Sequence, residues 1–373
     1  MVNPVRGLAR DIVASPKDLG GATSNGMRFC YINITQDPPS RDAVYLRGLE
    51  ENDCEILYCN DGSSTFLKKI WQIIKKHGHA KRNYDMLWVG YGAHNLVPLA
   101  KLISRKKVVF NALGSLYEGR ILSRRQAMPF SPKATWIWLI DFLAFHLSDV
   151  SLVETEAQKE WLMKKFFLGN NKLTVALTGV DDNLFFREPE ANMSATFTVL
   201  FRGGFLPESG IEYAIDAAEI LKNEKIKFRI IGRGQMEKIV KEKLAKFDSK
   251  NVEWISQKLE QNELRRLMQE CHTSLGQLSD HNRLTRTIPH KAFESLAMKI
   301  PYLTARNKAV LELLTENETC FCCRPADARD LADKIIWIKN NYEKAQKIAE
   351  NAYRLYLREL TPKILARKVL ESF

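Results

Sequence analysis

The sequence predicts an α/β protein made of two doubly wound domains with a ligand cleft between them. Its 373 residues exceed the size of one ordinary hydrophobic core. Short apolar segments alternate with amphipathic helical segments, as expected for βαβ units on a parallel sheet. The alternation occurs twice, on either side of a polar stretch at 187–195 that is typical of a linker. Because such sheets bind ligands at the carboxyl ends of their strands, the cleft is the expected site.

The elements follow in chain order. Strands of the first half are expected at 27–34, 54–59, 85–91, 107–112, 150–155 and 172–179. The helices between them are expected at 41–52, 64–77, 95–104, 132–147 and 156–168. Strands of the second half are expected at 196–204, 227–234, 251–257, 272–279, 301–305 and 319–325. The last helices are expected at 326–340, at 342–357 and within 358–373, and residues 1–26 are expected to form a poorly ordered tail.

Composition narrows the class of protein. With 45% hydrophobic and 27% charged residues, the chain has an ordinary globular composition rather than that of a disordered or fibrous protein. No apolar run reaches the roughly 18 residues that a spanning helix needs. The N-terminus lacks the apolar core of a signal peptide, so we expect a cytoplasmic protein. The seven cysteines show no metal-ligand spacing, and buried reduced thiols are expected rather than disulfides or a zinc site.

Two basic runs in the first half contribute to the net charge of +12. The first comprises Lys68, Lys69, Lys75, Lys76, Lys81 and Arg82, and the second comprises Lys101, Arg105, Lys106, Lys107, Arg120, Arg124, Arg125 and Lys133. The second run leads into an aromatic segment with Phe130, Trp136, Trp138, Phe142 and Phe145. Basic residues beside aromatic ones suit an anionic membrane surface. Nucleic acid is disfavoured because no binding motif accompanies the charge. A solvated basic face beside a buried helix is the alternative explanation.

The most informative segment runs from Cys271 to Leu314. Thr287 is expected to cap a helix that opens with Ile288 and Pro289, an early position that proline tolerates. On this helix Lys291 and Glu294 continue a stripe from Thr287. Free N–H groups, a cation and a carboxylate at a helix N-terminus suit a diphosphate followed by a sugar hydroxyl. A solvated surface helix is the alternative.

A second segment, FRGGFLPESGIEYAIDAAEIL, passes from a strand through a glycine turn into a helix that opens near Ser209. Arg202 ends the apolar strand, and Gly204 follows in the turn. The geometry is one that cradles anions. A Gly232–Gly234 pair lacks the third glycine of a dinucleotide fingerprint and is explained by a tight turn. No aspartate begins a D-x-D triplet, which disfavours a metal-bridged diphosphate.

These segments resemble retaining nucleotide-sugar glycosyltransferases of the GT-B fold, specifically glycosyltransferase family 4. The resemblance covers about Met27 to the C-terminus. It is strongest in FRGGFLPESGIEYAIDAAEIL, IIGRGQ and IPHKAFESLAMKIPYLTARNKAVLELL. It implies an acceptor-binding domain at 27–187, a nucleotide-sugar-binding domain at 196–357 and a C-terminal helix at 358–373 that packs back on the first domain.

The resemblance also implies roles for individual residues. Glu294 matches the glutamate that hydrogen-bonds the nucleotide ribose, and backbone amides near Thr287 would face the donor phosphates. Arg286 stands where the family has a sugar-contacting glutamate, and Asn111 stands where many members carry a His or Asp near the reacting sugar. Arg202 and Lys291 would neutralise the departing diphosphate.

Three further residues, His94, Ser40 and Arg41, would lie on the acceptor side of the cleft. A structural role is the alternative for His94, since a lone histidine is more often structural.

The predicted function is metal-independent, cofactor-free transfer of a sugar from a nucleotide diphosphate to a membrane-associated acceptor, such as a lipid-linked saccharide, in surface polysaccharide or glycan synthesis. The protein would act at the cytoplasmic face of the membrane. Two alternatives remain: a degenerate GT-B protein acting as a binding or scaffold partner, and a nucleotide-sugar epimerase on the same fold.

Overall fold

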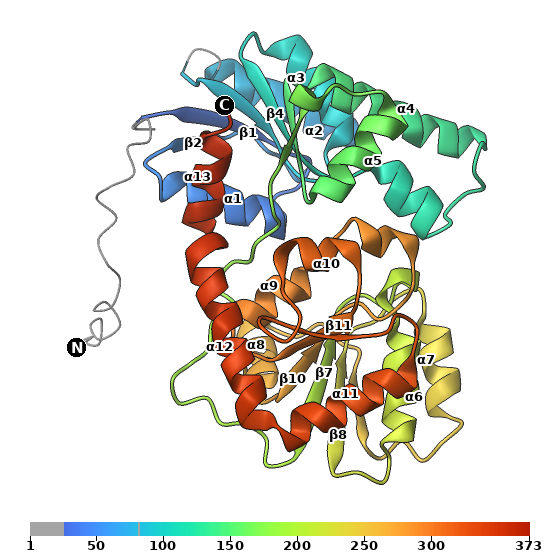
Figure 1. Cartoon of the computed structure of the whole chain (residues 1–373). Coiled ribbons are helices and arrows are strands. Elements are labelled where there is room, and N and C mark those ends of the chain that lie inside the picture. The colour runs from blue at the N-terminus through green and yellow to red at the C-terminus, as the bar shows by residue number, and fades with distance from the viewer. Residues whose placement is uncertain (1–25, 81–82) are drawn as a thin grey trace.

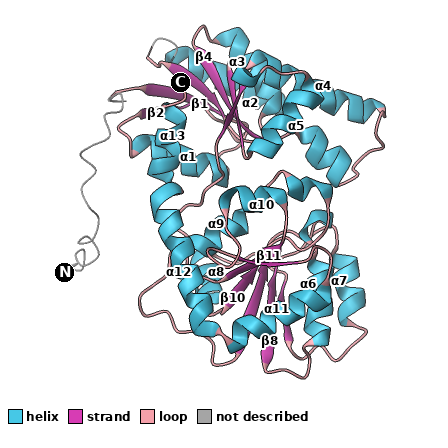
Figure 2. Ribbon diagram, in the orientation of Figure 1, coloured by secondary structure: helices cyan, strands magenta, loops and turns pink. Residues whose placement is uncertain are grey.

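A computed structural model describes residues 26–80 and 83–373 (Figure 1). The expected tail at 1–26 lies outside this part except for Gly26, and so do Lys81 and Arg82 of the first basic run. The described chain forms two α/β halves, each with a parallel sheet between helices (Figure 2). This confirms the predicted fold class.

The first sheet has the strand order β2-β1-β3-β4-β5-β6. Its strands are β1 Arg28–Ile32, β2 Glu55–Tyr58, β3 Met86–Val89, β4 Lys107–Leu113, β5 Val150–Val153 and β6 Leu173–Val175. Its helices are α1 Ser40–Glu50, α2 Phe66–Ala80, η1 His94–Leu96, α3 Val97–Ile103, η2 Glu118–Ser123, α4 Pro132–Leu147, α5 Glu156–Phe166 and η3 Asn170–Lys172. The short π-helix η2 was not expected from the sequence.

The second sheet has the order β12-β11-β10-β7-β8-β9. Its strands are β7 Phe197–Arg202, β8 Ile226–Ile231, β9 Val252–Ile255, β10 Thr273–Leu275, β11 Tyr302–Ala305 and β12 Phe321–Cys323. Its helices are η4 Pro207–Ser209, α6 Ile211–Ile220, α7 Glu237–Leu244, α8 Gln261–Gln269, η5 Asn282–Thr285, α9 His290–Ala297, α10 Lys308–Leu313 and α11 Ala328–Asn340. Central strands such as β7 are buried along almost their whole length, which is why they appear in the sequence as short continuous apolar runs.

Two C-terminal helices connect the halves. Helix α12, Tyr342–Glu359, rises along the second half, and α13, Pro362–Leu370, reaches the first half beside α1 (Figure 1). The helices α1 and α13 approach so closely that a Cβ on Gly48 would lie 2.1 Å from the carbonyl oxygen of Pro362. One continuous apolar cluster joins Trp88 of the first sheet, Phe293 of α9 and Tyr356 of α12. The C-terminal helix therefore packs back on the first half, as predicted.

Two further observations bear on the expected class. No helix in the described part of the chain is long and apolar enough to cross a membrane. All seven cysteines are buried free thiols, as predicted, and the closest described pair, Cys30 and Cys59, has its sulfur atoms 3.6 Å apart.

Candidate active site between the two halves

The loop after β7 is shaped by close backbone packing. Gly203 has φ +133°, and its N–H donates to the carbonyl oxygen of Ile231 at 2.9 Å. Gly232, in the neighbouring loop after β8, has φ +150°, and a Cβ there would lie 2.0 Å from the oxygen of Gly203. Only glycine allows both this φ and this approach. The two loops therefore hold Arg202, the last residue of β7, in a fixed place at the carboxyl edge of the sheet.

Helix α9 presents Lys291 and Glu294 toward the same edge. They are three positions apart and so share one face of the helix. Arg202 forms an ion pair with Glu294, in which the guanidinium donates to Oε2. The side-chain stem of Lys291 passes beside Gly203, because a Cβ on that glycine would lie 3.8 Å from Cε. The structure thus brings together the three residues that the sequence analysis proposed for diphosphate and ribose binding.

Lys291 is buried at this site rather than solvated. Its Nζ donates to the carbonyl oxygen of Gly276 at 3.0 Å and lies 4.0 Å from the ring centre of Phe201. Burial lowers its pKa to about 7, an effect that Arg202 reinforces and Glu294 opposes. An ammonium that is destabilised by burial gains from an arriving anion, and this favours a phosphate at Lys291.

The start of α9 differs from the prediction. The helix begins at His290 with Pro289 as its N-cap residue, and no side chain caps it. Thr287 does not cap the helix: its hydroxyl donates to the oxygen of Arg283 at 3.3 Å. The N–H of Ile288 instead donates at 3.0 Å to Oε2 of Glu154, a fully buried carboxylate from the loop after β5. A residue of the first half, Glu154, therefore holds the segment that leads into α9.

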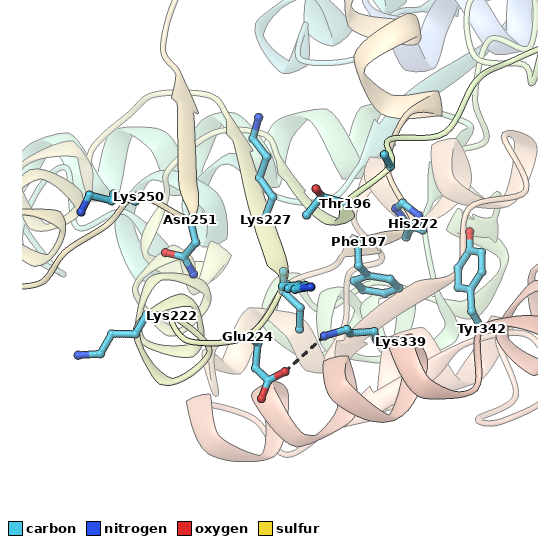
Figure 3. A pocket seen from close by; sticks show the side chains of 13 residues that line it. Thr196, Phe197, Lys222, Glu224, Lys227, Lys250, Asn251, His272, Lys339 and Tyr342 are labelled. Atoms are coloured by element: carbon cyan, nitrogen blue, oxygen red, sulfur yellow. Dashed lines mark hydrogen bonds and ion pairs between the residues drawn. The ribbon is translucent and has the colours of Figure 1, made fainter.

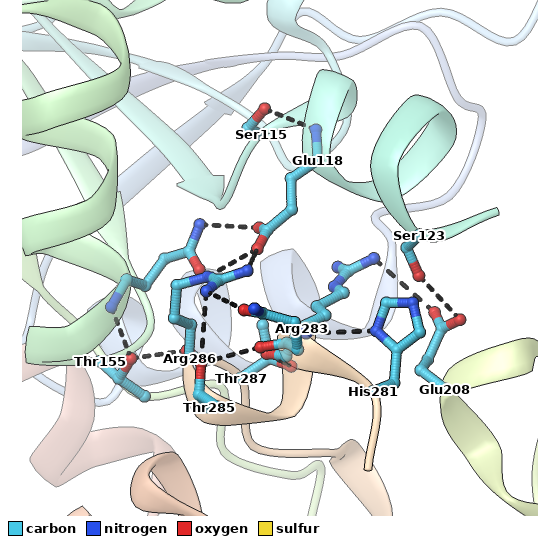
Figure 4. A network of polar contacts seen from close by, with 12 residues as sticks. Ser115, Glu118, Ser123, Thr155, Glu208, His281, Arg283, Thr285, Arg286 and Thr287 are labelled. Carbon is cyan, nitrogen blue, oxygen red and sulfur yellow. Dashed lines mark hydrogen bonds and ion pairs between the residues drawn. The ribbon is translucent and has the colours of Figure 1, made fainter. Parts of the chain in front are cut away.

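A second contact between the halves involves Arg286 (Figure 4). Its Nε donates to Oε1 of Glu118 at 2.8 Å, and its carbonyl oxygen accepts from the hydroxyl of Thr155 at 2.6 Å. The other oxygen of Glu118 accepts from Gln158 at 3.0 Å. Arg286 was proposed to contact the donor, but in this structure its charge is already balanced by Glu118 from η2.

Glu208 forms a third contact (Figure 4). It lies in η4, next to the loop after β7, and accepts from the hydroxyl of Ser123 at 2.9 Å. Guanidinium nitrogens of Arg124 and Arg283 lie 3.7 Å from its other oxygen. One buried carboxylate thus joins residues from both halves at the edge of the cleft.

A hollow of about 200 Å³ lies between the halves at this place. From the first half, its lining includes Gly114, Arg120 and Arg124, and from the second half it includes Arg283. His94 lies in its wall, almost fully buried. The Nε2 of His94 donates to the oxygen of Gly114 at 3.0 Å, and burial lowers the pKa of the imidazole, while the neighbouring Asp141 opposes this. The structure therefore places His94 in the wall of the hollow between the halves, and its acceptor-side role stays a prediction.

Two other predicted acceptor-side or catalytic residues are fully buried. Arg41 donates through Nε to Oδ1 of Asn111 at 2.7 Å, and Asn111 donates to Asp42 at 2.7 Å. Arg41 also donates to Thr178 and to a backbone oxygen. Ser40, the first residue of α1, is exposed. In this conformation Arg41 and Asn111 hold the loops of the first half in place.

The family of the second half follows from its sequence. Residues 182–355 match the model of the family Glycosyl transferases group 1. The second half is a glycosyl transferases group 1 domain. This match confirms the prediction of a glycosyl-transferring enzyme. None of the curated proteins matches the chain in sequence.

Solved structures resemble the whole described fold. HepE of Anabaena in complex with UDP-glucose has 14% identity and a TM-score of 0.68, covering 93% of this chain and 99% of that one. Sucrose-phosphate synthase of Thermosynechococcus elongatus has 13% identity and a TM-score of 0.71, covering 92% and 98%. A glycosyltransferase of Rickettsia africae has 16% identity and a TM-score of 0.65, covering 93% and 97%. At these identities the likeness shows the fold alone, and that fold is GT-B.

Several residues around the glycosyl transferases group 1 domain were missed by the sequence analysis. They are Glu118, Glu154, Glu208, Arg283 and His290. His290, the first residue of α9, is half-buried near Glu294, and partial removal from water lowers its pKa, with Arg41 and Arg202 adding to the effect. His290 could have been proposed from the sequence only because it directly follows Pro289, at the start of the predicted helix. The other four act through contacts between distant segments, which local patterns do not reveal.

Another hollow of the second half, about 740 Å³, lies at the amino ends of β7 and β8, away from the cleft, and its lining residues are drawn in Figure 3. It is lined by several lysines, but they do not converge on one point. Lys250 and Lys222 extend away from the other residues drawn, and Lys339 pairs with Glu224 at 3.3 Å (Figure 3). Lys227 pairs with Glu253 at 2.9 Å. Because its cations are dispersed or already paired, this hollow is a poorer anion site than the edge formed by Arg202 and Lys291.

Proposed function

We propose that the chain is a retaining, metal-independent glycosyltransferase of family 4. It would move a sugar from a nucleotide diphosphate to a membrane-associated acceptor, such as a lipid-linked saccharide, in surface polysaccharide or glycan synthesis. The observation that carries the proposal is the convergence of Arg202, Lys291 and Glu294 at the start of α9. HepE, which shares the fold, was crystallised with UDP-glucose, and this supports a nucleotide sugar as the donor.

The chemistry assigned to the site is mainly electrostatic. When the bond between the sugar and the diphosphate breaks, negative charge builds on the leaving oxygens. Arg202, protonated Lys291 and the free N–H groups at the start of α9 would stabilise that charge. Only Oε2 of Glu294 has a hydrogen-bond partner among the described residues. Its other oxygen is thus available for the ribose.

Retention would follow from attack on the same face as the leaving group. In that geometry the acceptor hydroxyl hydrogen-bonds to the departing phosphate, which takes its proton. The acceptor would enter from the hollow beside His94, opposite α9. This step needs no carboxylate pair of the kind that glycosidases use.

The surface of the first half supports the membrane proposal. Its α2–α4 face consists of exposed apolar side chains on two helices: Phe66, Leu67, Trp71 and Ile74 on α2, and Trp136, Leu139 and Leu143 on α4. On α2 the exposed Lys68 and Lys75 flank these residues, and the ammonium of Lys75 lies 5.3 Å from the ring centre of Trp71. Such a face suits peripheral binding to an anionic, cytoplasmic membrane surface.

The test is nucleotide binding by the purified chain. UDP, GDP, ADP and their sugars are screened for an increase in melting temperature, because a ligand that binds only the folded state stabilises it. One of the three nucleotides and its sugars should raise the melting temperature. The substitutions Glu294→Ala and Arg202→Ala should each abolish this increase. Glu224→Ala, which breaks an ion pair far from the cleft, is the matched control and should keep it. Full donor-sugar turnover by both site variants would contradict the proposal.

A further inference from the structure

If the acceptor is membrane-associated, the protein needs one site for the head group of that lipid and another for the start of its hydrocarbon chain. We propose that two adjoining hollows, one between the halves and one in the first half, bind the lipid phosphate part of the acceptor. The phosphate would lie among Arg120, Arg124 and Arg283, and the start of the chain would lie between α2 and α4. The inference deepens the proposed function and rests on it.

The hollow between the halves is cationic. Three arginines contribute to its lining, and Glu208 is the one carboxylate that pairs with two of them. Arg120 is exposed and makes no ion pair within the described part of the chain. The nearby Glu118 is engaged by Arg286 and so does not cancel this charge. An excess of guanidinium groups in a half-enclosed space suits a phosphate.

The second hollow is apolar and has a volume of about 430 Å³. It lies between the start of α2, the start of α3 and α4, and is lined mainly by Phe66, Pro98, Trp136, Ile140 and Leu143. Trp136 is 62% exposed and Phe66 is 48% exposed, although both are large apolar side chains. Exposed aromatic walls around a hollow of this size would fit a hydrocarbon chain.

His94 lies in the lining of both hollows, so the two meet at one side chain. A soluble acid would use only the arginines, and a hydrocarbon without charge would use only the aromatic walls. A molecule with a phosphate at the end of a chain uses both. The exposed lysines and apolar residues of the α2–α4 face would place the entrance at an anionic membrane, where such a lipid resides.

Geranyl phosphate is a suitable probe because its ten-carbon chain and phosphate match the two hollows. Its binding to the purified chain is measured by calorimetry and compared with geraniol, which lacks the phosphate, and with inorganic phosphate, which lacks the chain. Geranyl phosphate should bind at least tenfold more tightly than either. Equal binding of geraniol, or equal binding of inorganic phosphate, would overturn the proposal.

Exposed substitutions locate the site without unfolding the chain. Arg120→Gln should weaken geranyl phosphate binding roughly ten- to hundredfold, as expected for a lost charge-assisted contact. Trp136→Ser should weaken it as well. The matched controls Arg125→Gln and Trp337→Ser remove an exposed arginine and an exposed tryptophan outside the hollows and the α2–α4 face, and should change it less than twofold. If controls and site variants behave alike, the site is wrong.

A parallel titration with nucleotide diphosphates separates the two proposals. If a nucleotide binds and geranyl phosphate does not, the acceptor site is contradicted while the proposed function stands. If geranyl phosphate binds and no nucleotide does, the proposed donor chemistry fails and the lipid phosphate site remains.

Discussion

Arg202 at the end of β7 and Glu294 on α9 form an ion pair at the mouth of the proposed donor site. The arginine side chain is 24% exposed and the carboxylate 7%, so the pair is largely removed from water but reachable from the cleft. Each partner holds the other in place. A diphosphate that binds Arg202 would therefore meet a guanidinium whose position is already fixed.

The pair should be energetically coupled. Arg202→Met leaves a nearly buried carboxylate without its partner and should lower the free energy of unfolding by about 2–4 kcal/mol. In the double variant Arg202→Met, Glu294→Gln the loss should be smaller than the sum of the two single losses. Urea unfolding of the four proteins measures this. Simple additivity would show that the two side chains do not interact.

Lys291 should make nucleotide binding depend on pH. Its pKa in the folded protein is about 7, and the diphosphate favours the ammonium form. Nucleotide affinity should therefore fall as pH rises above about 7, and binding should take up a proton. Calorimetry in buffers of different ionisation enthalpy detects that proton. Lys291→Met should bind weakly at every pH, and a wild-type affinity that is constant from pH 6 to 9 would refute the assignment.

The same lowered pKa affects stability. In the unfolded chain Lys291 titrates near its ordinary value of about 10.4. Between about pH 7 and 10 the unfolded state then holds a proton that the folded state lacks, and this favours folding as pH rises. The free energy of unfolding of the wild type, minus that of Lys291→Met, should therefore increase as pH rises over this range. A difference that is constant with pH would mean that the lysine is charged in both states.

Asn111 should be more important for stability than its predicted catalytic role implies. Its side chain accepts from Arg41 and donates to Asp42, whose carboxylate also accepts from Tyr31, Asn33 and the N–H of Tyr91. All these contacts are buried, so Asn111→Ala leaves unsatisfied groups and should cost about 2–4 kcal/mol. Thermal unfolding tests this, with the exposed Asn192→Ala as a control for asparagine loss. A variant with unchanged melting temperature but no turnover would instead favour a direct catalytic role.

The contact between Glu118 and Arg286 should control how the halves close. Glu118→Gln keeps the shape of the side chain but removes the charge that balances Arg286. We expect a larger radius of gyration by solution scattering. We also expect the turnover number to fall by a larger factor than the donor KM changes. Glu343→Gln, on α12 and away from the cleft, is the control. An unchanged scattering profile and unchanged turnover would show that this contact does not hold the halves together.

The α2–α4 face should bind anionic vesicles. Trp71→Ser combined with Leu67→Ser should reduce co-sedimentation with vesicles that contain phosphatidylglycerol by about tenfold or more, since both side chains are exposed. Increasing salt should weaken the wild-type binding, because Lys68 and Lys75 contribute through charge. Leu102→Ser removes an exposed leucine on α3 as a matched control. Equal binding to neutral and anionic vesicles would contradict the electrostatic part of this account.

Much of the fold could be predicted because buried parallel strands leave a plain pattern in the sequence. The apolar run of β7 ends at Arg202, and this charge marked the carboxyl edge of the sheet in the sequence. Lys291 and Glu294 were predictable for the same reason, since helical spacing puts them on one face. These features depend only on neighbours in the sequence.

Contacts between distant segments could not be predicted. Arg286 is 168 positions from Glu118, and Ile288 is 134 positions from Glu154. The latter contact explains the wrong cap assignment, because Glu154 accepts the N–H that precedes the helix and leaves Thr287 to bond Arg283. The burial of Arg41 against Asn111 likewise follows from how α1 packs on the sheet, which composition and spacing do not encode.

The most direct test of the central claim is a crystal structure of the chain with a nucleotide diphosphate that stabilises it. The account predicts the diphosphate between Arg202 and Lys291 at the start of α9, with the ribose hydroxyls hydrogen-bonded to Glu294. A nucleotide bound elsewhere, such as in the lysine-lined hollow at the opposite end of the second sheet, would contradict it.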